Sequence, residues 1–451
     1  MLQAFANTFK IPDLRKKILI TFGVIAVYRL GTFIPTPGID GVKLAAFFEN
    51  LAKTQGGTLF GVMNLFSGGA IHRLTIFALG IMPYISSSII MQLLTVVVPA
   101  LEKLAKEGQM GYRKINQYTR YGTIVLSVIQ SFFIALWLEN PAHFGGLEIV
   151  SNPGVPFRIL TVLTLTTGSA FIMWLGEQIQ EKGIGNGMSI IVAAGILSRV
   201  PTAIFQIVTL VNPGRTGKAQ MDPLTAVFML LIMVVAIVAV IMVTQGERKI
   251  PVQYAKRVVG RKVFGGQSTF IPFKVNQGGV MPIIFAQSII LFPATIGVFV
   301  PNRFIQQASA AMASGTWGYT VIMMLLIVFF SYFYTAISFN PVDVAENMKK
   351  YGGFIPGVRP GESTAQFFDT IINRITLPGG IFLAFIAVAP DLIGKWLNVP
   401  HQVADFFGGT ALLIVVGVAL DTMKQIESQL LMRHYEGFMK RGRIRARQRT
   451  A

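Results

Sequence analysis

Long apolar runs separated by polar connections dominate the chain. A transmembrane helix needs about 20 consecutive apolar residues to cross the bilayer, and ten runs approach or exceed that length. We therefore expect an all-α polytopic membrane protein with about ten transmembrane helices. The expected spans cover residues 18–35, 74–98, 119–138, 157–177, 188–211, 223–244, 279–300, 319–339, 377–395 and 406–423.

One apolar segment is too short to cross a bilayer. It runs from Leu59 to Phe66 between two pairs of glycines, and a long apolar run from Leu74 to Val98 follows it. Half-inserted backbone at membrane depth is tolerated only where protein or a water-filled cavity surrounds it. The pattern therefore predicts a re-entrant piece that lies inside a lumen.

The composition agrees with lipid as the solvent. Of the 451 residues, 53% are hydrophobic and 13% are charged, which is about half the charged fraction of soluble domains. Cysteine is absent, so the chain has no disulfide and no thiolate metal site. The first residues lack the apolar core and cleavage site of a signal peptide, so we expect the first span itself to direct insertion.

The formal net charge of +19 is unevenly placed along the chain. Lys and Arg gather before the first span, between spans two and three, between spans six and seven, and in the tail after the last span. With ten spans, all four clusters lie on one side of the membrane. The positive-inside rule assigns that side to the cytoplasm, so both termini are predicted to be cytoplasmic.

Two of the loops on that side, 246–278 and 340–376, are unusually long for a compact bundle. The first alternates apolar and polar residues, with Gly265 and Gly266 at the predicted hairpin turn. The second is predicted to start as a helix and then turn around Arg359. Each loop is either a functional basic element or simply a solvated positive loop.

The span count divides the chain into two halves of five spans. The expected boundaries are 1–212 for the N-terminal half and 213–424 for the C-terminal half, followed by a basic tail at 425–451. Because each half holds an odd number of spans, the second must be inverted in the membrane. Inverted halves commonly enclose a pathway at their interface.

The residues that carry catalysis or bind metals are missing. The chain contains no HExxH, GxSxG or Walker A motif, and its four histidines lack ligand spacing, so we expect no cofactor. Acidic residues are nearly absent from the spans, so the side chains that usually form a proton or cation relay are missing. Arg29 and Arg199 lie within spans, and each either snorkels to the interface or serves a pathway.

Aliphatic pairs at helical spacing mark a second kind of candidate. Ile81 with Ile85, and Met188 with Val192, are spaced i, i+4 and so share a helical face. Bulky apolar groups in a lumen form a constriction that excludes water and ions. The alternative is ordinary packing against lipid or a neighbouring helix. The polar run at 86–88 with Gln92 likewise suits either a separable helix contact or static packing.

Several longer runs resemble one family. They are ALGIMPYISSSIIMQLLT at 78–95, RKINQYTRYGT at 113–123, the stretch 174–192 with its GIGNG, AKRVVGRKVFGGQST at 255–269, ILFPATI at 290–296, FNPVDVAENMKKYGGFIPGVRPGEST at 339–364 and FFGGTALLIVVGVALD at 406–421. The chain resembles the SecY family, the large subunit of the bacterial protein-conducting channel.

The resemblance implies a clamshell of two inverted five-helix halves around an hourglass pore. The pore ring would consist of Ile81, Ile85, Met188, Val192, Ile284 and Ile414. The re-entrant plug would cover about residues 59–70 and include Leu59, Phe60, Val62, Met63, Asn64, Leu65, Phe66, Ser67 and Gly68. A lateral gate between spans two and three and spans seven and eight would include Ser86, Ser87 and Gln92. Docking of cytosolic partners would use Arg257, Arg261, Lys262 and Arg359.

The family also implies a location and partners. It lies in the bacterial plasma (inner) membrane and acts with the small subunits SecE and SecG. The motor ATPase SecA or a ribosome carrying its nascent chain drives transport, with YidC and SecDF as further partners. Signal peptides and unfolded secretory polypeptides are the cargo, and the lipid bilayer receives transmembrane segments. Two alternatives are a secondary transporter and an intramembrane enzyme. A secondary transporter should show an ion site at the membrane midplane, and an intramembrane enzyme should show paired catalytic side chains; the sequence shows neither.

Overall fold

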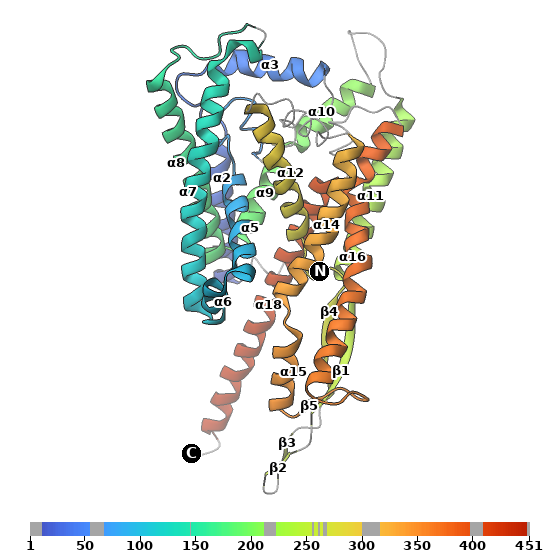
Figure 1. Ribbon diagram of the computed structural model, residues 1–451. Helices are drawn as coiled ribbons and strands as arrows, with labels where there is room; N and C mark the ends of the chain where they lie inside the picture. Colours follow the sequence, from blue (N-terminus) through green and yellow to red (C-terminus); the bar gives the residue numbers. More distant parts are fainter. Residues whose placement is uncertain are drawn as a thin grey trace. The chain divides into compact units, whose positions relative to one another are not determined.

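The computed structural model describes residues 11–54, 67–144, 146–211, 222–254, 257–259, 262–264, 268–299, 316–396 and 409–448. Most of these residues are helical (Figure 1). The helices are α2 (Pro12–Gly31), α3 (Gly41–Thr54), α5 (Met82–Val97), α6 (Pro99–Lys106), α7 (Gln109–Glu139), the 3₁₀-helix η1 (Pro141–Phe144), α8 (Val155–Lys182), α9 (Gly187–Leu197), α10 (Val200–Val211), α11 (Pro223–Gln245), α12 (Met281–Phe299), α14 (Trp317–Ser338), α15 (Pro341–Lys350), α16 (Glu362–Trp396) and α18 (Gly409–Gln448). The strands are β1 (Glu247–Tyr254), β2 (Arg257–Val259), β3 (Lys262–Phe264), β4 (Ser268–Lys274) and β5 (Gly353–Phe354).

The chain forms two compact units. The first comprises Met1–Ile204, Val298–Pro301 and Val418–Ala451, and the second comprises Phe205–Gly297 and Asn302–Gly417.

Among the described residues, seven helical segments are long and apolar enough to cross a membrane, and the bent pair α5–α6 makes an eighth. The seven are Gln109–Glu139, Val155–Lys182, Gly187–Thr209, Pro223–Gln245, Trp317–Lys350, Glu362–Pro390 and Gly409–Met432. Helices α2 and α12, of 20 and 19 residues, lie at the predicted first and seventh spans. The predicted all-α polytopic class is confirmed.

Prolines set the starts of many of these helices. Helices α2, α5, α6, α8, α11 and α15 each carry proline in the first two helical positions. Proline suits this place because its fixed φ is helical and its missing N–H has no intrahelical acceptor there. At α6 the same residue type produces a bend of 98° from α5, because Pro99 forces Val98 into extended backbone (φ −97°, ψ 111°).

The predicted second span is wrong in its first third. Residues 67–81 form turns, and α5 begins only at Met82. The backbone of this segment pairs with the chain after α2: Thr36 N donates to Leu74 O, and Ile76 N donates to Ile34 O, both at 3.0 Å. Non-helical backbone is stable away from water when protein satisfies its polar groups in this way.

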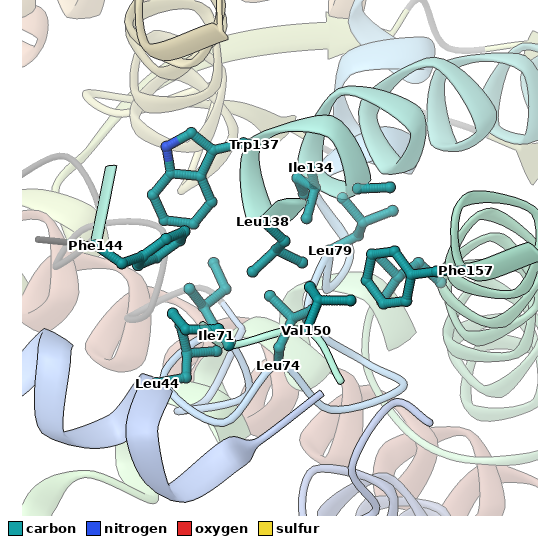
Figure 2. Close-up of a cluster of buried hydrophobic side chains, with 14 of the residues drawn as sticks. Leu44, Ile71, Leu74, Leu79, Ile134, Trp137, Leu138, Phe144, Val150 and Phe157 are labelled. Carbon is teal, nitrogen blue, oxygen red and sulfur yellow. The ribbon is translucent and has the colours of Figure 1, made fainter. Parts of the chain in front are cut away.

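Apolar side chains of this irregular segment help to form the main core of the first unit. Figure 2 shows Ile71, Leu74 and Leu79 among side chains from α3, α7, η1 and α8. Trp137 of α7 meets the ring of Phe144 of η1 edge-on, with centroids 4.6 Å apart. The apolar run therefore reflects burial inside protein, which periodicity alone does not distinguish from a lipid-facing helix.

Glycines bring α8 unusually close to its neighbours. A Cβ on Gly168 would overlap the backbone carbonyl of Ile76, and a Cβ on Gly187 would overlap the carbonyl oxygen of Gly176. Small residues allow such close backbone approach between helices in membranes. Helix α8 is thereby packed tightly against both the irregular segment and α9.

In the second unit, the two long loops form one folded body next to α14 and α16 (Figure 1). Strands β4, β1 and β5 make an antiparallel sheet in that order, and β2 pairs with β3. The predicted helical start of the second loop is confirmed as α15, which Asn340 caps by accepting hydrogen bonds from the backbone N–H groups of Val342 and Asp343.

The predicted hairpin turn at Gly265 and Gly266 lies outside the described residues. Before that position, β2 and β3 pair in antiparallel orientation, with Arg257 opposite Phe264 and Val259 opposite Lys262.

Candidate functional site

The first predicted pore positions lie at the start of α5. Ile81 is the N-cap residue of this helix, and the N–H of Ile85 donates to its carbonyl oxygen at 3.1 Å. Both side chains are buried, with 2% and 6% of their surface exposed. They therefore share one helical face, as their spacing predicted.

Met188 and Val192 are one turn apart on α9, and both are buried. Asn186 caps this helix by accepting a hydrogen bond from the N–H of Ser189 at 3.4 Å. The sulfur of Met188 lies against Gly176 of α8, where a Cβ would overlap it. At least part of the Met188 side chain is therefore engaged in packing α9 against α8, and Val192 has no exposed surface.

Two further pore positions belong to the second unit. Ile284 of α12 and Ile414 of α18 are 3% and 0% exposed. One turn from Ile284, the buried amide of Gln287 donates to the hydroxyl oxygen of Tyr319 at 3.4 Å, which joins α12 to α14. All six predicted ring residues are thus buried apolar side chains in their own units, whereas their arrangement as a ring stays a prediction.

Most of the predicted plug, residues 59–66, lies outside the described residues. Of the residues named for it, Ser67 and Gly68 are described, and they contact the end of α2. The hydroxyl of Tyr28 donates to the carbonyl oxygen of Ser67 at 3.3 Å, and Nη1 of Arg29 donates to that of Gly68 at 3.0 Å. The sequence left two roles open for Arg29, snorkelling to the interface or serving a pathway. In the structure, its guanidinium is hydrogen-bonded to the backbone of Gly68.

The predicted gate residues differ in their surroundings. Ser87 is buried, and its hydroxyl donates to the carbonyl oxygen of Thr119 of α7 at 2.8 Å. Gly122 leaves the space that this hydroxyl occupies. Ser86 is half-buried, and the half-buried Gln92 donates to the hydroxyl oxygen of Ser88 at 3.4 Å. Ser87 therefore ties the second predicted span to the third.

The body formed by the two long loops, here called the loop body, has its own apolar core. Its buried members come from β1, β4, α15, the following turn and α16: Ile250, Val252, Phe273, Met348, Ile355, Phe368 and Ile371. Phe368 is fully buried, with its ring centroid 5.4 Å from that of Phe273. The strand alternation places Ile250 and Val252 inward, and their sequence neighbours point to solvent.

Arg359 is exposed in the turn segment between β5 and α16. The flanking Ile355 is buried and Val358 packs against the core, with the N–H of Val358 donating to Ile355 O at 3.1 Å. The carbonyl oxygen of Arg359 itself accepts from the hydroxyl of Thr364 at 2.8 Å. The main chain on both sides of Arg359 is therefore tied to the loop body, while the Arg359 side chain is exposed.

Other basic groups lie in the same two loops. The two loops hold 11 Lys and Arg against five Asp and Glu. Arg257 and Lys262 lie on the paired strands β2 and β3, and Arg261 lies outside the described residues. Among the described residues, one of the five ion pairs belongs to this body and joins Lys249 to Glu247 at 3.3 Å. The excess of positive charge suits an acidic partner surface.

Sequence reasoning missed two features of these sites. The short strand β5 pairs with β1 and so joins the two loops into one sheet, but a two-residue strand has no visible alternation. The contact of Arg29 with Gly68 is long-range, and its only signal was an arginine in an apolar run. Within the described ranges, no three His, Asp or Glu side chains are grouped to hold a metal ion.

Comparisons with known proteins agree on one family. The SecY family profile matches residues 75–423. The protein translocase subunit SecY of Aquifex aeolicus (strain VF5) is 45% identical over 434 residues, which cover 96% of this chain and 98% of that protein.

Two solved structures share the fold at low sequence identity. One is a SecY protein whose plug domain is described as stabilising the closed state of the translocation channel and maintaining a membrane seal; it has a TM-score of 0.60 and 17% identity. The other is Sec61 in the canine ribosome-channel complex from the endoplasmic reticulum, with a TM-score of 0.58 and 14% identity. Each comparison covers 93% of this chain and 96% of the other.

Proposed function

Because this chain belongs to the SecY family of protein translocase subunits, it is a subunit of a protein-conducting membrane channel, and we propose that it passes unfolded secretory polypeptides through a pore lined by apolar side chains. The observation that carries this proposal is the 45% identity over nearly the whole chain. The family match over residues 75–423 includes every predicted pore position. The protein is not an enzyme, so the direction of transport comes from a partner.

In this proposal, Ile81, Ile85, Met188, Val192, Ile284 and Ile414 form the narrowest part of the pore. Apolar side chains contact an extended polypeptide without binding it strongly, because they offer it neither charges nor hydrogen bonds. The same side chains exclude water and ions when no polypeptide is present.

We assign the seal on the outer side to the plug at about 59–70. The related SecY protein with a described plug domain supports this assignment. For the lateral exit of signal sequences and transmembrane segments, we propose a gate that includes Ser86, Ser87 and Gln92. An apolar segment gains about 25 cal/mol for each Å² of apolar surface that it transfers into lipid.

The loop body is proposed to dock the SecA motor ATPase or the translating ribosome. The exposed Arg359, and Arg257 and Lys262 on the strands β2 and β3, support this role, and we include the neighbouring Arg261. A related channel is known in complex with a ribosome. Complementary charge brings an acidic partner onto such a basic surface and orients it there.

The expected assembly contains SecE and SecG as small membrane subunits, with YidC and SecDF as further partners. The multi-pass membrane location follows from the family and the apolar helices. We place the protein in the bacterial plasma membrane with both termini in the cytoplasm, because the basic clusters then obey the positive-inside rule. The N-terminal half is proposed as 1–212, the C-terminal half as 213–424 and the tail as 425–451.

Crosslinking from a stalled secretory chain tests the pore. Because the chain has no cysteine, single cysteines at Ile85, Val192 and Ile284 give unambiguous attachment points for a photoreactive probe. Cysteines at Val234 and Phe385, whose side chains are 48% and 57% exposed, serve as controls on apolar helix surfaces. Crosslinks at the first three positions and none at the controls support the pore. Crosslinks at the controls alone would contradict it.

A further inference from the structure

Two neighbouring side chains at the end of α2 hold the backbone of Ser67 and Gly68 from one side. The hydroxyl of Tyr28 donates to Ser67 O at 3.3 Å, and the guanidinium of Arg29 donates to Gly68 O at 3.0 Å. Tyr28 is 1% exposed, so its hydrogen bond is shielded from water. A hydrogen bond from an ionised donor is about twice as strong as a neutral one.

Helix α9 closes the other side of this contact. A Cβ built on Gly68 would lie 3.1 Å from the Cα of Gly195 and 3.0 Å from the hydroxyl oxygen of Tyr28. Gly68 and Gly69 have φ of +65° and +94°, values that side chains other than glycine rarely adopt. The backbone at Gly68 therefore lies in a slot that fits glycine and no larger residue.

The two holding side chains are themselves fixed. The ring of Tyr28 stacks on Phe77 with centroids 6.0 Å apart, and the guanidinium of Arg29 lies 5.5 Å from the ring centroid of Phe33. Packing of this kind limits the rotamers that a side chain can adopt. The Tyr28 hydroxyl and the Arg29 guanidinium are therefore oriented toward the two carbonyl groups in advance.

We propose that Arg29, supported by Tyr28, is a positioning residue that fixes the Ser67–Gly68 backbone to the first unit in the closed channel and thereby sets how readily the channel opens. This inference rests on the proposed function, in which residues 67 and 68 belong to the plug. The contact is made to main-chain carbonyls, so it can be broken and remade without any change in the chain's charge. The guanidinium is therefore a latch on the backbone, and its position inside an apolar run is explained by that bond.

Arg73 provides a matched control. Its guanidinium also lies 5.5 Å from the centroid of Phe33, and it is more exposed than Arg29. Replacing either arginine by glutamine removes one positive charge and one contact with the Phe33 ring. Only Arg29→Gln also removes the hydrogen bond to Gly68.

The experiment measures both the position of residue 67 and the seal. In the cysteine-free chain, Ser67→Cys places a thiol where the native side chain is 1% exposed. The complete channel in liposomes is treated with a membrane-impermeant maleimide, and chloride leakage is recorded without a secretory chain. Loss of a part-buried charge-assisted bond should raise the labelling rate and the leakage roughly tenfold in Arg29→Gln, and Arg73→Gln should resemble the parent.

The outcomes separate this inference from the proposed function. Tyr28→Phe keeps the ring on Phe77 and loses one neutral hydrogen bond, so it should raise both readings by a smaller factor. If Arg29→Gln inserts poorly into the membrane, the Tyr28→Phe variant alone decides the test. Unchanged labelling, or increased labelling with unchanged leakage, in both variants would overturn the inference. Failure of the parent channel to transport a secretory chain would contradict the proposed function and leave the labelling result intact.

Discussion

Gln253 of β1 pairs with Phe354 of β5, so two loops that lie far apart in the sequence share one sheet. Neighbouring Tyr254 extends the pairing to Gly353, and its ring fills the space that a side chain at 353 would need. The loop body is therefore a small folded unit with a core, and a disturbance of that core should affect both loops together.

Phe368→Ala should unfold the loop body while the membrane spans stay inserted. Phe368 is fully buried between Phe273 and Phe339, and removal of a buried phenylalanine side chain costs about 3–5 kcal/mol. Limited proteolysis should then cut both loops 246–278 and 340–376. Phe385→Ala on the same helix α16 is the control, because that ring is 57% exposed. Cleavage in one loop alone would contradict a shared core.

Arg359→Glu should weaken export that SecA or the ribosome drives, because it reverses a charge on the proposed docking surface. The backbone bonds of the turn do not involve the guanidinium, so the fold should persist. Export of a secretory protein into membrane vesicles, together with the thermal unfolding midpoint, checks both statements. Arg374→Glu, an equally exposed basic position of α16, is the matched control. Normal export by Arg359→Glu would remove the proposed role.

Deletion of Asn64 to Gly69 should raise ion leakage through the resting channel without preventing assembly. The reason is that the proposed plug would lose its end and its contact with α2. Conductance of the complex in planar bilayers measures the effect, and recovery of the intact complex in detergent is the control. A conductance equal to that of the unmodified channel would argue against the plug.

Acid should destabilise the first unit through His72. Burial, aided by the positive charges of Arg199 and Arg73, lowers the pKa of His72 to about 4, and its ring stacks on Phe48 at 5.1 Å. Between the ordinary pKa of 6.5 and about 4, the unfolded chain binds a proton that the folded chain does not. The contribution of His72 to the free energy of unfolding is therefore fully present above pH 6.5, and the free energy of unfolding should fall by about 2 kcal/mol by pH 5.

His72→Gln should flatten this pH dependence, because the amide does not titrate. Thermal unfolding of the purified protein at pH 7.5 and pH 5 compares the two chains. His434→Gln, a histidine of the tail, controls for general effects of losing an imidazole. Equal acid sensitivity in His72→Gln and the parent would show that other groups cause the destabilisation.

Hydrophobic run length was sufficient to predict most spans, because a lipid-facing or buried transmembrane helix must be apolar along its whole length. It failed at residues 74–81, whose apolar side chains are buried against α3 and α7 inside the protein. There Pro83 and the left-handed Gly80 delay the start of the helix until Met82. Run length alone does not distinguish burial in protein from burial in lipid.

In the candidate site, too, the sequence predicted local features and missed long-range contacts. Spacing correctly predicted that Ile81 and Ile85 share a face, because that is a local property of the helix. The bond from Ser87 to Thr119 and that from Arg29 to Gly68 depend on which helices become neighbours. No local pattern encodes such contacts, so they became visible only in the folded chain.

The close approach of Gly187 to Gly176 limits how this protein can evolve. A Cβ at position 187 would overlap a carbonyl oxygen of α8, which belongs to the backbone and is the same whatever side chain stands at 176. No second-site substitution in α8 can therefore compensate by becoming smaller. Position 187 should therefore tolerate glycine only. In a library that randomises position 187 and every neighbouring side chain, all functional variants should carry glycine at 187.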